Sequence, residues 1–355
     1  MKLFLIAAVI VAFGFSISTK NLDQLTINKI QVIGSHNSYK VAIDSTLFKL
    51  ISENNKSDLS GLEYSHPPIT TQLDLGLRNL EIDIYSDTLG GKYAEPFGLK
   101  LVKNQPPFDT EKKMRLPGFK VFHVQDIDFR SHHPLFKDYL IELKEWSKKN
   151  PKHEPIFITM NAKDDEIKKP GFIIPEKFVA KTFDALEGDI KHYLGEEKLI
   201  KPADIQGNYS TLENAVLKSN WPKLKNARGK FIFVLDEEGA KRNMFIEHHP
   251  SLKGRIMFVN ALPNTPEAAI LILNDPKKNQ ALIKQYVESG YIVRTRADAE
   301  TIQARKNDFS QFEAAKLSGA QIISTDYYLK SNHFVSEYRV SFENDAFIRK
   351  NPLFY

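Results

Sequence analysis

The chain has 355 residues, of which 42% are hydrophobic and 26% charged, so general disorder and a fibrous fold are excluded. Its 49 Lys and Arg exceed its 44 Asp and Glu by only five, a smaller positive charge than nucleic-acid-binding proteins usually concentrate, and no nucleic-acid partner is predicted. The absence of cysteine excludes disulfides, thiolate zinc sites, iron–sulfur clusters and a cysteine nucleophile.

The first residues are predicted to be a secretory signal peptide over residues 1–18. Lys2 supplies a positive start, an apolar run covers residues 3–15, and small polar residues follow from Ser16. That run is shorter than the roughly 20 residues that a membrane-spanning helix needs, although an N-terminal anchor or a buried helix is the alternative. No cysteine follows it, so a lipid anchor through cysteine is excluded. We expect the remainder, residues 19–355, to be secreted or periplasmic.

Eight short apolar runs rich in β-branched or aromatic residues are predicted to be strands. Most are continuously hydrophobic, as is typical of strands buried on both faces of a parallel sheet. They cover residues 30–35, 78–85, 120–124, 155–161, 230–236, 255–261, 291–296 and 320–325.

Segments with helical periodicity lie between these runs. The clearest cover residues 134–149, 175–186, 265–289 and 299–318, the last of them ending at Gly319. Alternation of strand and helix about eight times predicts an α/β fold, a single-domain (β/α)₈ TIM barrel. A doubly wound open sheet is the alternative, but no glycine-rich first turn of the dinucleotide-binding kind is present. The long connections 86–119 and 162–229 are predicted to be loops, because neither carries a large apolar core of its own.

Polar residues gather at the ends of the first three predicted strands, where a barrel places its chemistry. His36 and Asn37 follow the first strand, Glu81 and Asp83 end the second, and His123 lies in the third. The two carboxylates are two residues apart and therefore share one face of their strand. Buried together, they would repel each other unless a cation or a proton lay between them. The alternatives are a metal ion, a salt bridge to an arginine such as Arg296, and a strand end exposed to water.

The combination of these motifs resembles the catalytic region of phosphatidylinositol-specific phospholipases C, in particular the secreted bacterial calcium-dependent branch. The likeness extends over roughly residues 30 to 330. The segments that carry it are IGSHNSY at 33–39, LEID at 80–83, FH at 122–123, VRTRAD at 293–298 and GAQIISTDYY at 319–328.

The resemblance implies a phosphoric diester hydrolase or lyase that cleaves the glycerol–phosphate bond of inositol phospholipids. Attack by the inositol 2-hydroxyl would yield diacylglycerol and an inositol phosphate, cyclic or linear, so no nucleophile from the protein is needed. His36 and His123 match the catalytic histidines of the family. Asn37, Glu81 and Asp83 match its calcium ligands, and these hard oxygen donors suit Ca²⁺.

The fourth strand departs from the animal members of the family, which place a further metal-binding carboxylate there. Asn161 occupies that position and can still offer an oxygen to Ca²⁺, with less charge. Lys163 is an alternative that would hold the phosphate as a point charge, and a third reading makes Asn161 a strand-end cap and Lys163 solvated surface.

The last two predicted strands carry further candidates for binding the substrate. Arg294 and Arg296 share one face, which suits an arginine that holds a phosphate or a carboxylate. Asp298 and Asp326 follow the two strands and are expected either to hold inositol hydroxyls or to pair with these arginines. Tyr327 and Tyr328 are predicted to form either an aromatic wall against the sugar or a tip at the membrane interface. Arg296, Asp298 and Tyr327, together with Lys163, are the predicted substrate contacts.

The expected partner is an inositol phospholipid at a membrane surface, and no protein partner is predicted. One alternative is another metal-dependent barrel phosphodiesterase with a glycerophosphodiester or sphingolipid substrate. The glycerophosphodiesterases have His-Arg after the first strand, whereas this chain has His36-Asn37. The other alternative is a non-catalytic barrel that binds lipid or glycan, against which the presence of both histidines and both carboxylates argues.

Overall fold

The computed structural model of the protein describes residues 22–54 and 58–354. The predicted signal peptide, residues 1–18, lies outside the described residues. Among those described, no helix combines the length and the apolar character needed to cross a membrane.

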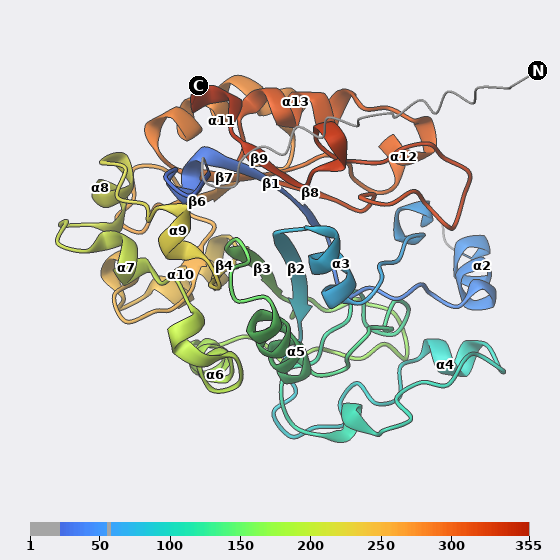
Figure 1. The fold of residues 1–355 in the computed structure, drawn as a ribbon. Coiled ribbons are helices and arrows are strands. Elements are labelled where there is room, and N and C mark those ends of the chain that lie inside the picture. The colour runs from blue at the N-terminus through green and yellow to red at the C-terminus, as the bar shows by residue number, and fades with distance from the viewer. Residues whose placement is uncertain (1–21, 55–57, 355) are drawn as a thin grey trace, which may run out of the picture.

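Eight parallel strands form a nearly closed barrel, which confirms the predicted fold class (Figure 1). Their order around the sheet is β5-β4-β3-β2-β1-β8-β7-β6, and a single bridge between Asn260 and Ile270 links the two outer strands. The strands are β1 (Ile30–Ser35), β2 (Asn79–Ile84), β3 (Ile156–Ala162), β4 (Phe231–Leu235), β5 (Phe258–Val259), β6 (Ile270–Ile272), β7 (Ile292–Arg296) and β8 (Ile322–Thr325).

The strand predicted at residues 120–124 is wrong. β2 pairs directly with β3, with Asp83 opposite Asn161, so no edge is left for a strand between them. Lys120 makes only isolated bridges, to Tyr85 and Leu135. Phe122 of this run is buried beneath the loop that follows β2, in a small separate core, while Val121 packs into the main core. Burial under a loop and burial in a sheet both require apolar residues, so the apolar pattern could not distinguish a buried loop from a strand.

The eighth strand is β6, which falls inside the helix predicted at residues 265–289. The helix, α11 (Pro276–Ser289), begins later, where the Asp275 side chain accepts a hydrogen bond from the Lys278 backbone N–H. Proline at the first helical position is preorganised for this start. The predicted helix 299–318 is likewise divided into α12 (Ile302–Lys306) and α13 (Ser310–Ser318), with Asn307 in the left-handed region between them.

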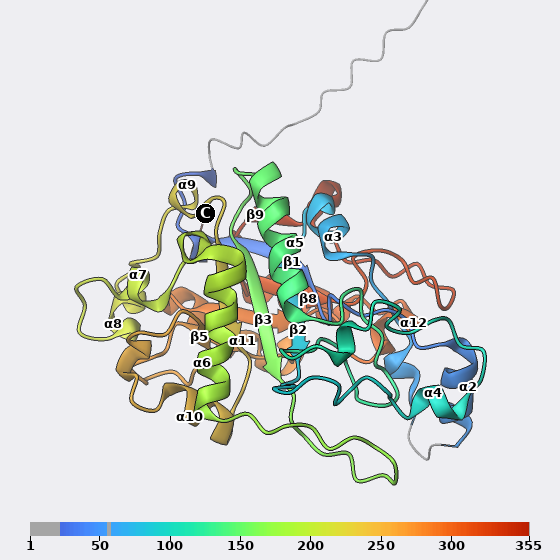
Figure 2. The same cartoon turned by 90° about the horizontal axis from the view of Figure 1, so that it is seen from below.

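The other helices surround the barrel, and Figure 2 shows α5 and α6 on either side of β3, which they precede and follow in the chain. The helix predicted at residues 134–149 is α5, and the one predicted at 175–186 is α6, which begins a few residues later. The bounds are α2 (Ser45–Glu53), α3 (Ile69–Leu75), α4 (Gly98–Leu101), α5 (Phe136–Lys149), α6 (Ala180–Asp189), α7 (Pro202–Gln206), α8 (Leu212–Leu217), α9 (Leu224–Ala227) and α10 (Gly239–Ile246).

The seam between β1 and β2 brings the first two functional segments together. The strands pair at one position, Gly34 opposite Asn79, and a Cβ on Gly34 would lie 2.3 Å from the Asn79 Cβ. Before that point a short antiparallel strand, β9 (Ile348–Lys350), covers the edge of β1 instead. Glycine therefore permits the close approach that sets the end of β1 beside β2.

Candidate active site

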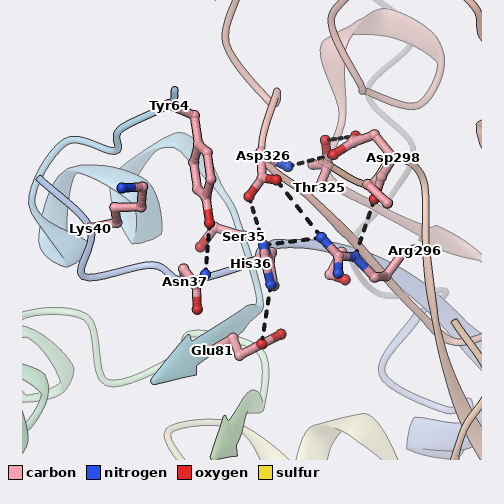
Figure 3. Close-up of polar contacts among 12 residues, drawn as sticks. Ser35, His36, Asn37, Lys40, Tyr64, Glu81, Arg296, Asp298, Thr325 and Asp326 are labelled. Carbon is pink, nitrogen blue, oxygen red and sulfur yellow. Dashed lines mark hydrogen bonds and ion pairs between the residues drawn. The ribbon is translucent and has the colours of Figure 1, made fainter. Parts of the chain in front are cut away.

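The carboxyl ends of β1, β2, β7 and β8 bring polar side chains together in one cluster (Figure 3). His36 directly follows β1, and its backbone N–H donates to the Thr325 carbonyl at the end of β8. Glu81 lies on β2 and Arg296 ends β7. The meeting of predicted site residues from distant parts of the chain is a consequence of barrel closure, because the strands are parallel and end at one rim.

His36 forms a dyad with Asp326, whose Oδ1 lies 2.9 Å from the imidazole Nδ1. A carboxylate only accepts, so Nδ1 carries the proton and Nε2 is left facing Glu81, with 3.6 Å between Nε2 and Oε1. Burial, followed by the positive charge of Arg296, lowers the pKa of His36 despite the two carboxylates. The ring is therefore neutral near neutral pH, with its free nitrogen directed into the site.

Asp326 is the functional residue that sequence reasoning left most open. Burial opposes its ionisation, but His36, His66 and Arg296 outweigh that effect and hold the pKa of Asp326 well below its usual range. The Arg296 guanidinium lies 3.9 Å from Asp326 Oδ2 and 3.1 Å from the same His36 Nδ1, where the Nδ1–H tautomer makes the second approach a close contact and not a hydrogen bond. The predicted pairing of Asp326 with Arg296 is present, but its shorter contact, with the imidazole of His36, was not predicted.

His123 forms a second dyad of the same design. Its Nδ1 lies 2.8 Å from Asp128 Oδ2, and Lys40 Nζ lies 2.5 Å from the same oxygen. The Lys40 and Asp128 side chains are both fully buried. Lys40 is four residues beyond His36, so one short segment of chain supports both dyads. Tyr85, just after β2, donates from its hydroxyl to the His123 carbonyl at 3.0 Å.

The two carboxylates of β2 are both buried and both paired with cations. Glu81 Oε2 pairs with Arg294 of β7, across the barrel, while Asn161 donates to Glu81 Oε1 at 3.2 Å. Asp83 Oδ2 lies 3.5 Å from Lys163 Nζ. The sequence predicted an arginine partner and offered Arg296 as the example, whereas Arg294 is the arginine that makes the salt bridge. Burial disfavours the charge on Glu81, yet Arg294 and His36 outweigh it and lower the pKa of Glu81.

The oxygen donors expected for Ca²⁺ lie on adjacent elements. Asp83 is the register partner of Asn161, and Glu81 shares its face of β2, while Asn37 follows β1. Within residues 22–54 and 58–354 no group of three or more His, Asp or Glu is arranged to hold a metal, so a site here needs the amide oxygens as well. Two carboxylates and two amides fit the hard donor set of calcium.

Two of the predicted substrate contacts are placed below the surface. The carboxylate of Asp298 is 0% exposed and accepts from the Thr325 hydroxyl and, at 2.9 Å, from the Asp326 backbone N–H. Burial and then the charge of Asp326 raise the pKa of Asp298 to about 7. Tyr327 packs against Phe334 and borders a cavity of about 390 Å³. Asp298 thus stabilises the turn after β8, whereas Tyr327 lies in the wall of the cavity.

The fold and the residue types define a barrel phosphodiesterase with two histidines and an oxygen-ligand set at its rim. A family model described as phosphoinositide phospholipase C, Ca²⁺-dependent, matches residues 25–352, and the chain belongs to that family. It is accordingly a phosphodiesterase that acts on phosphoinositides, and Ca²⁺ is its cofactor. No curated protein sequence matches the chain.

Solved structures of bacterial enzymes share the fold. A calcium-dependent phosphoinositol-specific phospholipase C from a Pseudomonas species is 16% identical with a TM-score of 0.55, and the match covers 93% of this chain and 97% of that chain. A calcium-dependent phosphatidylinositol-specific phospholipase C from Streptomyces antibioticus is also 16% identical, with a TM-score of 0.54, covering 85% of this chain and 95% of that one.

Proposed function

We propose that the protein cleaves the glycerol–phosphate bond of inositol phospholipids by attack of the inositol 2-hydroxyl, releasing diacylglycerol and inositol cyclic phosphate. The observation that carries the proposal is the pair of His–Asp dyads, one beside Glu81 and one on the loop that follows β2. In-line displacement at phosphorus needs one group to remove a proton and another to supply one, and two oriented imidazoles meet that need.

Calcium would be held by Asn37, Glu81, Asp83 and Asn161. When bound, it lowers the pKa of the attacking hydroxyl and neutralises charge that develops on the phosphate. The donor types support this assignment, because two carboxylates and two amides on adjacent elements offer the hard oxygen ligands that calcium prefers.

His36 is suited to accept the proton of the 2-hydroxyl through Nε2. Asp326 holds the Nδ1–H tautomer, and the lowered pKa keeps the ring unprotonated and able to accept. As the new bond forms between the hydroxyl oxygen and phosphorus, the bond from phosphorus to the glycerol oxygen breaks. His123, oriented by Asp128, is assigned the proton donated to that departing oxygen.

Two cations are suited to hold the phosphate. Lys163 is 35% exposed and near Asp83, and Arg296 lies beside the His36 dyad with 17% of its side chain exposed. Their charge complements the equatorial oxygens of the transition state. The substrate would be met at a membrane surface. The proposal includes export, on the basis of the apolar run at residues 3–15.

The test is turnover of phosphatidylinositol vesicles by the purified protein, with calcium or with a chelator, followed by phosphorus NMR of the water-soluble product. We expect inositol cyclic phosphate, loss of turnover with chelator, and recovery when calcium is returned. His36→Ala and His123→Ala should each lower kcat by about 10²–10⁴-fold, the usual contribution of an acid or a base.

His153→Ala is the matched control, because this buried histidine precedes β3 at the opposite end of the barrel, where its side chain bonds to Ser147 and the Glu154 carbonyl. Release of choline or glycerophosphate in place of an inositol phosphate would favour the other barrel phosphodiesterases. Equal turnover in chelator and calcium would contradict the proposal outright.

A further inference from the structure

The turn that carries His36 and Asn37 is held by two side chains from a distant loop. Asn37 has φ of 44°, in the left-handed region that non-glycine residues adopt at a cost, and it is only 1% exposed. Such a conformation persists only where the surroundings determine it. The surroundings here are Tyr64 and His66, which precede α3 and lie 2% and 5% exposed.

Tyr64 orients the carboxamide of Asn37. Its hydroxyl oxygen lies 2.7 Å from Asn37 Nδ2 and accepts from it, since an amide nitrogen can only donate. Figure 3 shows the amide oxygen directed away from Tyr64, on the side where Glu81 lies, and this oxygen also accepts from the Tyr39 hydroxyl at 3.1 Å. The Tyr64 ring also stacks on His36, with centroids 6.1 Å apart and 25° between the planes.

His66 holds the backbone at His36. Its Nε2 lies 2.8 Å from the His36 carbonyl oxygen, and because a carbonyl only accepts, Nε2 carries the proton. Nδ1 is then the acceptor for the Tyr328 hydroxyl, 3.1 Å away, and the two rings stack at 5.4 Å. The tautomer of His66 is therefore determined by its two partners.

The same His66 N–H also faces the acidic member of the dyad, with 3.7 Å between Nε2 and Asp326 Oδ1. Tyr328, its other partner, is two residues beyond Asp326. His66 thus joins the segment after β1, which carries His36, to the segment after β8, which carries Asp326. The backbone N–H of His66 donates to the Lys40 carbonyl, which fixes the loop to the same turn.

We propose that His66 is a positioning residue for the His36–Asp326 dyad and that Tyr64 is a positioning residue for the calcium ligand Asn37. The assignment rests on the proposed function, which gives proton transfer to His36 and calcium binding to Asn37. Because the two residues act on different partners, their loss should change different constants, although they are only two positions apart.

Tyr64→Phe keeps the ring and removes the oxygen that orients Asn37. We expect calcium affinity, measured by calorimetric titration of the protein without substrate, to fall about tenfold or more, the usual effect of losing a group that orients a ligand. Raising calcium to saturation should restore most of the kcat that is lost at low calcium, since the dyad is intact.

His66→Phe keeps the ring against Tyr328 and removes the N–H that bonds the carbonyl. We expect kcat at saturating calcium to fall about 10- to 100-fold, because small displacements of an oriented group are costly, while calcium affinity stays unchanged. His66→Gln, whose amide can donate to the same carbonyl, should recover part of the loss. His66→Ala should respond to added imidazole, since His66 lines the cavity of about 390 Å³.

His153→Phe is the control for loss of a buried histidine, and thermal denaturation of every variant measures stability separately. The inference is overturned if His66→Phe lowers kcat no more than His153→Phe does, or if both new variants change the same constant. Wild type that shows no calcium-dependent cleavage would overturn the proposed function and this inference together. Separate losses, one in calcium affinity and one in kcat, support it.

Discussion

Replacing Lys40 by Met should remove the cation that neutralises Asp128, and with it the support of His123. The ion pair has 2.5 Å between Nζ and Oδ2 and neither side chain is exposed. Met fills a similar volume, so the lost packing is small and the main cost is an uncompensated buried charge. Removal of one partner from a buried pair costs about 3–5 kcal/mol, a large part of the roughly 5–15 kcal/mol that keeps a domain folded.

The pH dependence of this loss follows from the pKa of Asp128. Burial would raise that pKa, but Lys40 and His123 outweigh burial and lower it. In the wild type the contribution of the carboxylate is therefore present above its ordinary pKa and is lost as pH falls through the lowered value. Without Lys40, protonation of the Asp128 carboxylate relieves the cost. The difference in unfolding free energy between variant and wild type should shrink as pH falls below about 4, the ordinary pKa of an aspartate side chain.

Urea denaturation followed by tryptophan fluorescence at several pH values measures this difference, and kcat is measured on the same preparations. Lys120→Met is the matched control, because Lys120 and Asp87 form another buried pair at 3.1 Å that contacts neither histidine. Both variants should lose stability, but Lys40→Met alone should lose most of its kcat. A loss under about 1 kcal/mol, or an equal loss at every pH, would refute the reasoning.

Three further predictions concern other parts of the site. Asp326→Asn should lower kcat about 10²-fold or more with KM little changed, because the amide can bond the His36 ring in the wrong tautomer; a wild-type kcat in steady-state assays would contradict this. Lys163→Gln removes the cation that lies 3.5 Å from Asp83. Calorimetry should then find calcium bound about tenfold more tightly, and the KM for the anionic lipid should rise. Weaker calcium binding by the variant would contradict this prediction. Gly34→Ala places a methyl group 2.3 Å from the facing side chain of β2. Urea denaturation should detect a loss of about 1–3 kcal/mol in the free energy of unfolding, the usual cost of overpacking. Unchanged stability would show that β1 and β2 can move apart at this position.

The strand prediction succeeded or failed according to where apolar residues are buried. The runs that form β1 to β5, β7 and β8 are buried by helices or other strands on both faces, and their continuously apolar composition indicates this burial. Residues 120–124 have the same composition because Phe122 packs between Tyr85 and Tyr93. β6, only three residues long, is too short to show a period of its own.

The chemistry of the candidate site was visible in the sequence because its members lie in short motifs at strand ends. Because parallel strands end at one rim of a barrel, the motifs His36-Asn37 and Glu81-x-Asp83 could be placed together from the sequence. His123 was predicted as a strand-end residue as well, but its segment is a loop. Asp128, five residues further on, orients it there.

What the sequence alone determined is the fold class, the residue types of the site and the kind of metal they suit, since these depend on local pattern and donor chemistry. What only the tertiary structure decided is the pairing: Asp326 with His36, Arg294 and not Arg296 with Glu81, and Lys40 with Asp128. Arg294 and Arg296 share one face of one strand and are chemically alike, so nothing local distinguishes them. Their distances to Glu81 across the barrel distinguish them, because an ion pair forms only between charged atoms that the register of the strands brings within reach.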